Sequence, residues 1–531
     1  MKFYKKYIIT IVGIALALTS CTDRFANIND SEYGFTDNQL EQDFNHVRSL
    51  FAPMLNNIYT YDPAWKMQLQ QNLIGDVYSG YMMPPTPFAG NINNMNYALV
   101  DGWNGFPWSI AYGEIMSNAL KIKQRAESNY PQFYAWSLIL KVEAMHRVSD
   151  IYGPIVYSAY GTENALISYD SQQAVYNKFF DELDIAVADL TARVNAGESS
   201  KFVGTDFTKY NGDYAQWVKF ANSLRLRLAM RIAMADPVKA QQEAEKAINH
   251  PLGVFTSNGD NAIVASPKYN HPLIVINSAW NDIRMGAPME SILKGYNDPR
   301  ISTYFQPSTV VSGEYKGIRN GIDIAAKSDY AVFSPLGDVI DTNEIVWMSA
   351  AEVYFLRAEG ALRGWNMGDT AQNLYNMGIS TSFEQHGVGG AATYTNDATS
   401  TAIPYVDPVN AVNNVPAGNP HLSTITIKWD NTASNEEKLE KIITQKWIAM
   451  FPDGQEAWSE FRRTGYPKLF TVVINNSNGE ISTEDFIRRI NFPRSEYDKN
   501  PEGVLTGVSH LGAGNPDTGG TRLWWDTGSN F

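Results

Sequence analysis

Two polar segments of the sequence place tryptophans beside side-chain amides. The segment DGWNGFPW contains Trp103, Asn104 and Trp108, and the segment INSAWNDIR contains Trp280 and Asn281. An indole ring stacks on flat apolar surfaces such as the C–H face of a sugar ring, and an amide offers both a donor and an acceptor to ring hydroxyls. A few such groups converging on one place are typical of a small-molecule site, so these residues are candidates for carbohydrate contacts.

Each of these aromatic residues also has an interpretation as part of the core. Trp108 stands just before a helical pattern and would anchor the start of that helix equally well. Trp103 lies between glycines in a polar loop, which favours exposure, whereas Trp280 could instead be tucked onto the scaffold. Tyr81, at the end of the segment GDVYSGY, either extends the aromatic set or seals a helix.

The sequence contains none of the common catalytic signatures. H-E-x-x-H, G-x-S-x-G and G-x-x-x-x-G-K-[ST] are all absent, and the 7 histidines show no metal-ligand spacing. Carboxylates near the candidate segments could form a glycosidase pair, which needs a separation of about 5–5.5 Å or 6.5–9.5 Å. These carboxylates are Asp76, Asp101, Glu114 and Asp282. We expect no catalytic residue, no metal and no cofactor, and a glycoside hydrolase is the less favoured alternative.

The amino terminus has the pattern of a secretory signal. Three lysines precede an apolar run over residues 8–18, which is too short to cross a bilayer as a stable helix. The following Leu18-Thr19-Ser20-Cys21 resembles the lipobox of bacterial lipoproteins, in which the cysteine is acylated. Cys21 is the only cysteine in the sequence, so disulfides, thiolate catalysis and cysteine-ligated zinc are excluded. The sequence predicts a signal peptide over 1–20 and lipidation at Cys21.

The composition describes an acidic globular protein. The whole chain has a net charge of −14, and removal of residues 1–20 deletes three lysines and no acid, which gives −17. Binding to nucleic acid or to an anionic membrane surface depends on basic patches, so neither is expected. With 44% hydrophobic and 18% charged residues, the chain is expected to fold and not to be disordered.

Helical periodicity dominates the organisation of the chain. Apolar residues recur at intervals of three and four over 214–232, with Arg227 and Arg231 on the other side of the predicted helix. Asp236-Pro237 ends this helix and begins the next one, which makes a helical hairpin. A similar hairpin is predicted at 351–379, and further pairs at 136–194 and 436–463. Stacked hairpins of this kind partly match tetratricopeptide units.

Long segments rich in Gly, Asn, Pro and Tyr separate the hairpins, at 75–108, 253–345, 387–432 and 499–531. Loops of this length in a compact protein are commonly functional or ordered by packing. We therefore predict a single mainly α-helical domain over 21–531, covered by long loops with a few short strands and with a loop-rich insertion at about 387–432.

Five motifs in order resemble those of the SusD/RagB family of nutrient-binding outer-membrane lipoproteins. They are DIYGPIVYSA at 150–159, NDPR at 297–300, MSAAEVYFLRAEGALRGW at 348–365, QKWIAMFPDGQEAWSEFRRTGYP at 445–467 and TRLWWD at 521–526. Val156 departs from the family, where proline is usual at this place. The resemblance covers nearly the whole chain after the signal.

The resemblance implies a cell-surface, lipid-anchored protein of a Gram-negative bacterium with tetratricopeptide-like hairpins. Such proteins cap a SusC-like TonB-dependent transporter and capture oligosaccharides without cleaving them, and some members of such families capture peptides or other nutrients. In the starch-binding prototype, paired tryptophans and an amide before the equivalent helix stack on sugar, and Trp103, Asn104 and Trp108 stand at the matching place. The segment at 387–432 and the tail are plausible suppliers of a transporter interface.

Overall fold

The computed structural model describes residues 42–164 and 166–531. The predicted signal peptide and Cys21 lie outside these residues. The segment that ends at Ser49 forms a unit of its own, in which the described residues include η1 (Gln42–Phe44) and α4 (Asn45–Arg48). Residues Leu50–Phe531 form one compact unit, which contains every element considered below.

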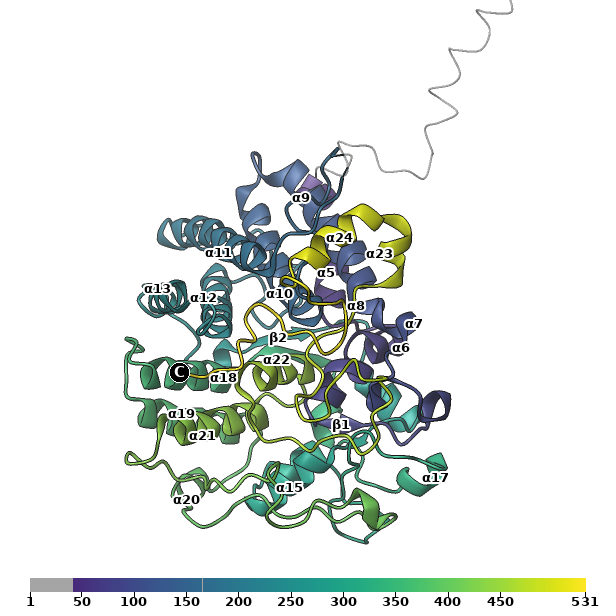
Figure 1. The fold of residues 1–531 in the computed structure, drawn as a ribbon. Coiled ribbons are helices and arrows are strands. Elements are labelled where there is room, and N and C mark those ends of the chain that lie inside the picture. Colours follow the sequence, from purple (N-terminus) through teal and green to yellow (C-terminus); the bar gives the residue numbers. More distant parts are fainter. Residues whose placement is uncertain (1–41, 165) are drawn as a thin grey trace, which may run out of the picture. The chain divides into compact units, whose positions relative to one another are not determined.

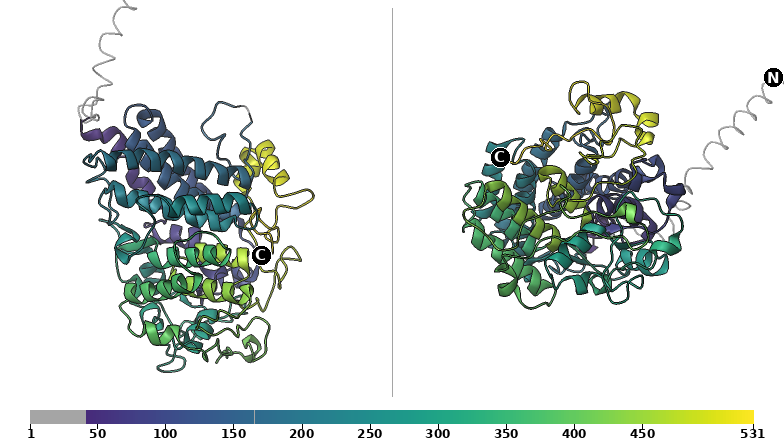
Figure 2. Two further views of the ribbon diagram at one scale, coloured as in Figure 1. Left: turned by 90° about the vertical axis from the view of Figure 1, so that its left-hand side faces the viewer. Right: turned by 60° about the horizontal axis from the view of Figure 1, so that its bottom comes forward.

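Helical hairpins make up the scaffold of this unit, as predicted. Helices α10 (Pro131–Tyr152), α11 (Gln172–Asn195), α12 (Tyr214–Arg231) and α13 (Pro237–Ile248) pack in succession, each against the next (Figure 2). A second group comprises α18 (Ala350–Leu362), α19 (Ala371–Gln385) and α21 (Asn435–Ala449), which pack against one another. Contact between α12 and α18 joins the two groups, and Figure 1 shows the two helices one above the other on the left of the molecule.

The helix boundaries follow the local sequence signals. The Asp236 side chain accepts a hydrogen bond from the Lys239 amide at 3.2 Å, and Pro237 fills the first position of α13. Proline is favoured there because its missing N–H would have no partner in the helix. The side chains of Ser349 and Thr370 cap α18 and α19 in the same way. The predicted break between α12 and α13 is confirmed.

Short elements and loops cover the scaffold. β1 (Met82–Met83) pairs antiparallel with β3 (Arg284–Met285), and β2 (Ala262–Ala265) pairs antiparallel with β4 (Glu344–Met348). The segment at 387–432 contains α20, η9 and an isolated bridge between Tyr405 and Val415. The remaining elements of the unit are α5 (Phe51–Asn57), α6 (Ala64–Met67), η2 (Gln68–Asp76), η3 (Phe88–Asn91), η4 (Asn94–Asn96), α7 (Asp101–Asn104), α8 (Phe106–Ile110), η5 (Ala111–Met116), α9 (Ser117–Ala126), η6 (Asn258–Asp260), α14 (Pro272–Ile274), η7 (Val275–Ala279), α15 (Ala287–Gly295), α16 (Ile301–Tyr304), α17 (Lys327–Tyr330), η8 (Asp338–Ile340), α20 (Ala391–Thr395), η9 (Ala411–Asn413), α22 (Gly454–Thr464), α23 (Arg494–Lys499) and α24 (Pro501–Ser509).

A buried ionic network joins four helices at the centre of the unit. Arg227 of α12 donates to both carboxylate oxygens of Glu352 on α18 at 2.8 Å. Arg231, one turn further on, pairs with Glu456 and Glu460 of α22 at 2.5 Å each. Lys446 of α21 completes the network 3.1 Å from Glu460, and all six side chains are at most 3% exposed. The side of α12 that carries Arg227 and Arg231 is therefore buried against carboxylates.

A close crossing links this network to the loops. Helix α22 packs against η2, and the two meet at Gly454 and Gly75. A Cβ atom added to Gly454 would lie 2.4 Å from Cα of Asp76, and one added to Gly75 would lie 2.6 Å from Cα of Gln455. Only glycine allows the two backbones to approach so closely. Because α6, α7 and α8 in turn pack on η2, this crossing fixes the base from which those short helices project.

The carboxyl-terminal tail is anchored in the same core. Trp525 is fully buried, and its indole N–H donates to Asp150 of α10 at 2.9 Å. The guanidinium of Arg231 lies over its ring at 5.4 Å. Trp525 is therefore a structural residue of the core. Among the described residues, no helix has the length and apolar character that a membrane span requires.

Replacing Arg231 with methionine should strongly destabilise the protein. The change keeps the volume of the side chain but leaves Glu456 and Glu460 buried with less compensating charge, and the loss of one partner from a buried pair costs about 3–5 kcal/mol. The measurement is the free energy of unfolding from urea denaturation. Arg494→Met is the matched control, because Arg494 is 72% exposed and pairs with Asp498 at the surface. It should cost about 1 kcal/mol or less, and equal losses in both variants would contradict the stabilising role of the network.

Candidate functional site

Half-exposed aromatic side chains gather on the short elements that project from η2. Trp65 of α6 is 41% exposed and meets Phe106 of α8 edge to face, with ring centroids 5.4 Å apart. Phe88 of η3 meets Trp103 of α7 in the same way at 5.6 Å. Edge-to-face contacts are the preferred geometry for aromatic pairs and fix the orientation of each ring. With Trp280, these residues are called the aromatic surface below.

Trp280 is held beside the others by its loop. This residue follows η7, which packs against α6, the helix that carries Trp65. The Thr86 hydroxyl donates to the Asp282 carboxylate, which ties the loop before η3 to the loop after η7. Lys327 donates to the Trp280 carbonyl at 2.7 Å and to Asp282 at 2.5 Å. The loop that presents Trp280 is therefore fixed by hydrogen bonds from two other segments.

The local sequence explains how these rings reach the surface. Pro63 precedes α6, and Pro107 stands in the first turn of α8, where its missing N–H costs nothing. The Asn93 side chain caps η4 by accepting from the Met95 amide at 2.9 Å. Asn94 donates to the Asn104 side chain at 2.8 Å, which joins the loop before α7 to α7 itself. A proline and asparagine framework thus supports the aromatic surface.

Three of the predicted site residues are accessible. Trp103, Trp280 and Asn281 are all partly exposed. Asn281 has a left-handed backbone with φ of 58°, and its side-chain oxygen accepts a hydrogen bond from Arg284. Because the oxygen is occupied, the amide nitrogen is the part of Asn281 that remains available to a ligand. The structure brings Trp103 and Trp280 into one region and leaves an amide beside the second of them.

The other three predicted site residues lie inside the protein. Tyr81 is fully buried and donates its hydroxyl hydrogen bond to the carbonyl of Trp447. Trp108 packs between Tyr112, Tyr152 and Tyr169, with centroids 4.6 to 5.5 Å away.

Asn104 is buried as well, with its side-chain oxygen bonded to Asn94. The expectation that Tyr81, Asn104 and Trp108 contact a ligand is therefore corrected, because protein groups occupy their rings and polar atoms. They support the surface from below. For Tyr81 and Trp108 this is the alternative that the sequence left open, in which the aromatic ring seals or anchors a helix.

Trp65 and Phe88 belong to the aromatic surface, yet the sequence did not single them out. Trp65 follows Asp62-Pro63-Ala64, and Phe88 lies in a proline-rich loop. A large aromatic ring next to proline in a polar segment is the signal that could have found both. Their convergence depends on the packing of α6 and η3 against α7 and α8, which periodicity does not reveal.

Two of the four acidic candidates, Asp76 and Asp282, are engaged by other groups of the protein. Asp76 is fully buried and accepts hydrogen bonds from Gln71, Asn72 and the Gly454 amide. Burial raises its pKa to about 7, against hydrogen bonds that lower it. Asp282 is committed to Thr86 and Lys327. The geometry of these two carboxylates serves to hold loops together.

One cluster of potential metal ligands occurs among the described residues, formed by His146, Asp150 and Glu456. All three are buried, and Arg231 lies 3.4 Å from Asp150 and 2.5 Å from Glu456. The guanidinium therefore already supplies the positive charge that a metal ion would bring. Burial lowers the pKa of His146, but the neighbouring Asp150 and Glu143 outweigh it and raise the pKa above its usual value. His146 is therefore a structural residue of the core.

Stacked helical hairpins of this kind place the protein in the tetratricopeptide-like fold class. Residues 27–526 match the family model described as SusD-like, Susd and RagB outer membrane lipoprotein. The chain belongs to this family of outer-membrane lipoproteins, and the family resemblance of its motifs is confirmed.

Solved structures of SusD homologues share the fold along their whole length. A chitin-binding SusD homologue from Flavobacterium johnsoniae is 56% identical with a TM-score of 0.89, and the match covers 92% of this chain and 100% of that one. A SusD homologue from Bacteroides vulgatus is 39% identical with a TM-score of 0.85, again over 92% and 100%. A SusD-like protein from Bacteroides thetaiotaomicron is 35% identical with a TM-score of 0.83, over 90% and 98%. No curated protein matches the chain.

Alanine substitutions of Trp103 and Trp108 should differ in how much they lower the free energy of unfolding. Trp108→Ala removes a buried ring and should lower the free energy of unfolding by about 3–5 kcal/mol. Trp103→Ala removes a partly exposed ring and should cost about 1 kcal/mol or less. Urea denaturation measures both. If Trp103→Ala proved as costly as Trp108→Ala, Trp103 would belong to the packed interior and not to an accessible surface.

Proposed function

We propose that the protein binds oligosaccharides at the aromatic surface and delivers them to a SusC-like TonB-dependent transporter. The observation that carries the proposal is the set of half-exposed rings held in fixed orientations, with Trp65 against Phe106 and Phe88 against Trp103. Fixed rings lose little entropy when a ligand stacks on them, so they suit the weakly hydrated faces of sugar rings.

One relative supports a particular class of glycan. A homologue that is 56% identical over its full length is described as chitin-binding, which favours β-linked N-acetylglucosamine oligomers as ligands of this chain. The acetyl groups of such oligomers add apolar contacts and an amide, which match rings flanked by the free amide nitrogen of Asn281. Several accessible rings suit an oligomer better than a single sugar.

The proposal assigns no cleavage to this site. Asp282 is held by Lys327 and Thr86, and Asp76 is buried among its own partners. Both carboxylates are thus bonded to other protein groups, whereas a general acid must be free to give its proton to the glycosidic oxygen. Delivery to a transporter rests on family membership, and a non-catalytic role agrees with it.

Loss of either surface tryptophan should weaken glycan binding. Trp103→Ala and Trp280→Ala should each reduce the affinity for N-acetylglucosamine hexamer about tenfold or more, measured by isothermal titration calorimetry, because each removes one stacking platform. Trp365→Ala is the matched control, since Trp365 is also partly exposed but lies in the turn after α18. It should bind as the unaltered protein does.

Unchanged affinity in both surface variants would contradict the site. If the unaltered protein bound no member of a panel of glycans and bound peptides instead, capture of a different nutrient would be favoured. Chromatography of the glycan after prolonged incubation tests for cleavage, and the appearance of shorter oligomers would support a glycoside hydrolase.

Replacing Cys21 with alanine should release the protein from the membrane without altering its ligand binding. The predicted acylation site would be lost, and the chain would then fractionate with soluble proteins and no longer co-purify with outer-membrane transporters. Membrane fractionation followed by affinity purification measures both. A variant that stayed bound to membranes after salt and carbonate washes would contradict lipidation at Cys21.

A further inference from the structure

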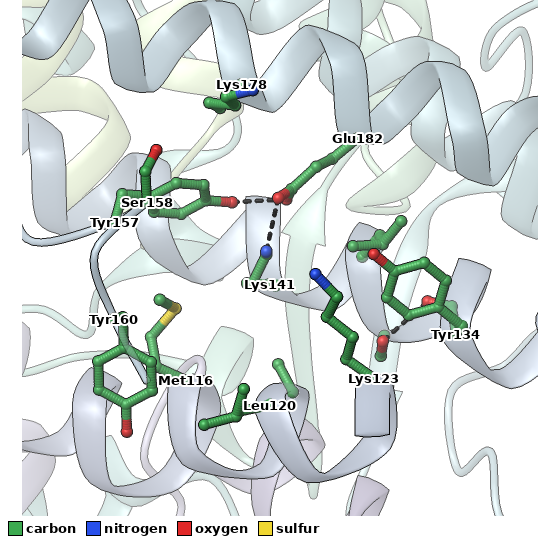
Figure 3. Close-up of a pocket in the computed structure, with 13 residues that line it drawn as sticks. Met116, Leu120, Lys123, Tyr134, Lys141, Tyr157, Ser158, Tyr160, Lys178 and Glu182 are labelled. Atoms are coloured by element: carbon green, nitrogen blue, oxygen red, sulfur yellow. Dashed lines mark hydrogen bonds and ion pairs between the residues drawn. The ribbon is translucent and has the colours of Figure 1, made fainter. Parts of the chain in front are cut away.

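A hollow lies between helices α9, α10 and α11 and the loop at 157–160. It has a volume of about 310 Å³ and shares no lining residue with the aromatic surface (Figure 3). This volume is at the lower end of the range for small-molecule sites, so the hollow suits one sugar ring and not a polymer segment. Its walls have a chemistry that differs from that of the aromatic surface.

Lysines dominate the charge of this hollow. Lys123 of α9, Lys141 of α10 and Lys178 of α11 line it, and Glu182 is the only acidic residue among the described residues that line it. The hollow therefore has a net charge of about +2 within a protein whose net charge is −14. Because salt screens exposed charges beyond about 8–10 Å, these nearby lysines outweigh the distant acidic surface for a ligand inside.

Glu182 is already satisfied by protein groups. Its two carboxylate oxygens receive Lys141 at 2.6 Å and the Tyr157 hydroxyl at 2.6 Å, as Figure 3 shows. Burial raises the pKa of Tyr157, and the nearby charge of Glu182 raises it further. The hydroxyl therefore remains protonated and acts as a donor. This bonding neutralises Lys141 and leaves the other two lysines to set the charge that a ligand meets.

Lys123 and Lys178 are available to bind an anion. The ammonium group of Lys123 has no ion-pair or hydrogen-bond partner among residues 42–164 and 166–531, and in Figure 3 the side chain reaches from α9 into the hollow. Lys178 is 3.8 Å from Asp181, and both side chains are more than half exposed. Exposed pairs of this kind are weak, so Lys178 can exchange Asp181 for a ligand at little cost.

The remaining walls suit the rest of a sugar. Met116 and Leu120 of η5 and α9 give an apolar floor, and Tyr134 and Tyr160 stand on either side of it in Figure 3. The exposed Ser158 offers a hydroxyl, and the backbone of its loop is fixed because its amide donates to Asp170 at 2.7 Å. An apolar floor, aromatic edges and a hydroxyl surround the two lysines.

We infer that this hollow binds a single sugar ring that carries an anionic oxyacid group. The anionic group, either a carboxylate or a sulfate ester, accepts from the ammonium group of Lys123, and Lys178 on the opposite wall adds positive charge (Figure 3). The ring lies over Met116 and Leu120, and its hydroxyls bond to Ser158. We call this hollow the anion pocket. It is a site for acidic sugars that is independent of the neutral glycan site proposed above.

Calorimetry at low ionic strength with glucuronate, glucose 6-sulfate and glucose tests the anion pocket. We expect at least one of the two anionic sugars to bind and glucose not to bind, and the one that binds identifies the anionic group as carboxylate or sulfate. Lys123→Gln with Lys178→Gln should weaken this binding about tenfold or more, since charge-assisted hydrogen bonds are lost. Lys121→Gln is the matched control, because it removes the same charge from an exposed position on α9 outside the hollow, and it should leave the affinity unchanged.

Three results would overturn the inference. They are no binding of either anionic sugar, equal binding of glucose, or unchanged affinity in the double lysine variant. Trp103→Ala separates the two sites, since it should weaken binding of N-acetylglucosamine hexamer and leave the anionic sugar unaffected. Loss of the anionic sugar in Trp103→Ala would place its binding at the aromatic surface and would also overturn the inference.

Discussion

Arg231 of α12 lies between Glu456 and Glu460 of α22 at 1% exposure, and the organisation of the whole unit depends on this contact. Charges in a buried site are costly unless each has a partner, so the helices that supply them can pack in only one arrangement. Glu352 of α18 and Lys446 of α21 belong to the same network, so the need for paired charges links the second group of helices to α12 of the first group. The network thereby fixes how the stacked hairpins meet.

The position of the aromatic surface follows from that constraint. Helix α22 is held by the network and crosses η2 at Gly454 and Gly75, where no side chain would fit. The short helices that carry Trp65, Trp103 and Phe106 then pack on η2. The scaffold in this way fixes the loops and short helices that present the binding surface. Function is commonly added to a fold through loops that a rigid scaffold positions.

Parts of this structure follow directly from the sequence. The apolar spacing at 214–232 and the Asp236-Pro237 signal predict α12, α13 and their boundary, because helix periodicity and capping are local properties. Burial of Arg227 and Arg231 is not local, since their carboxylate partners lie over 100 residues away. The same limit applies to the site. Trp103 and Tyr81 both stand in polar loops, and only the packing of Trp447 over Tyr81 distinguishes the buried ring from the exposed one.

The two hollowed or open regions of the surface have complementary chemistry, with neutral stacking at the aromatic surface and positive charge at the anion pocket. The central claim concerns the first of them, that a glycan stacks on rings held by η2 and its neighbours. A crystal structure of the complex with N-acetylglucosamine hexamer tests this claim most directly. The account predicts sugar rings in van der Waals contact with Trp103 or Trp280, and density for the glycan elsewhere, with both rings bare, would contradict it.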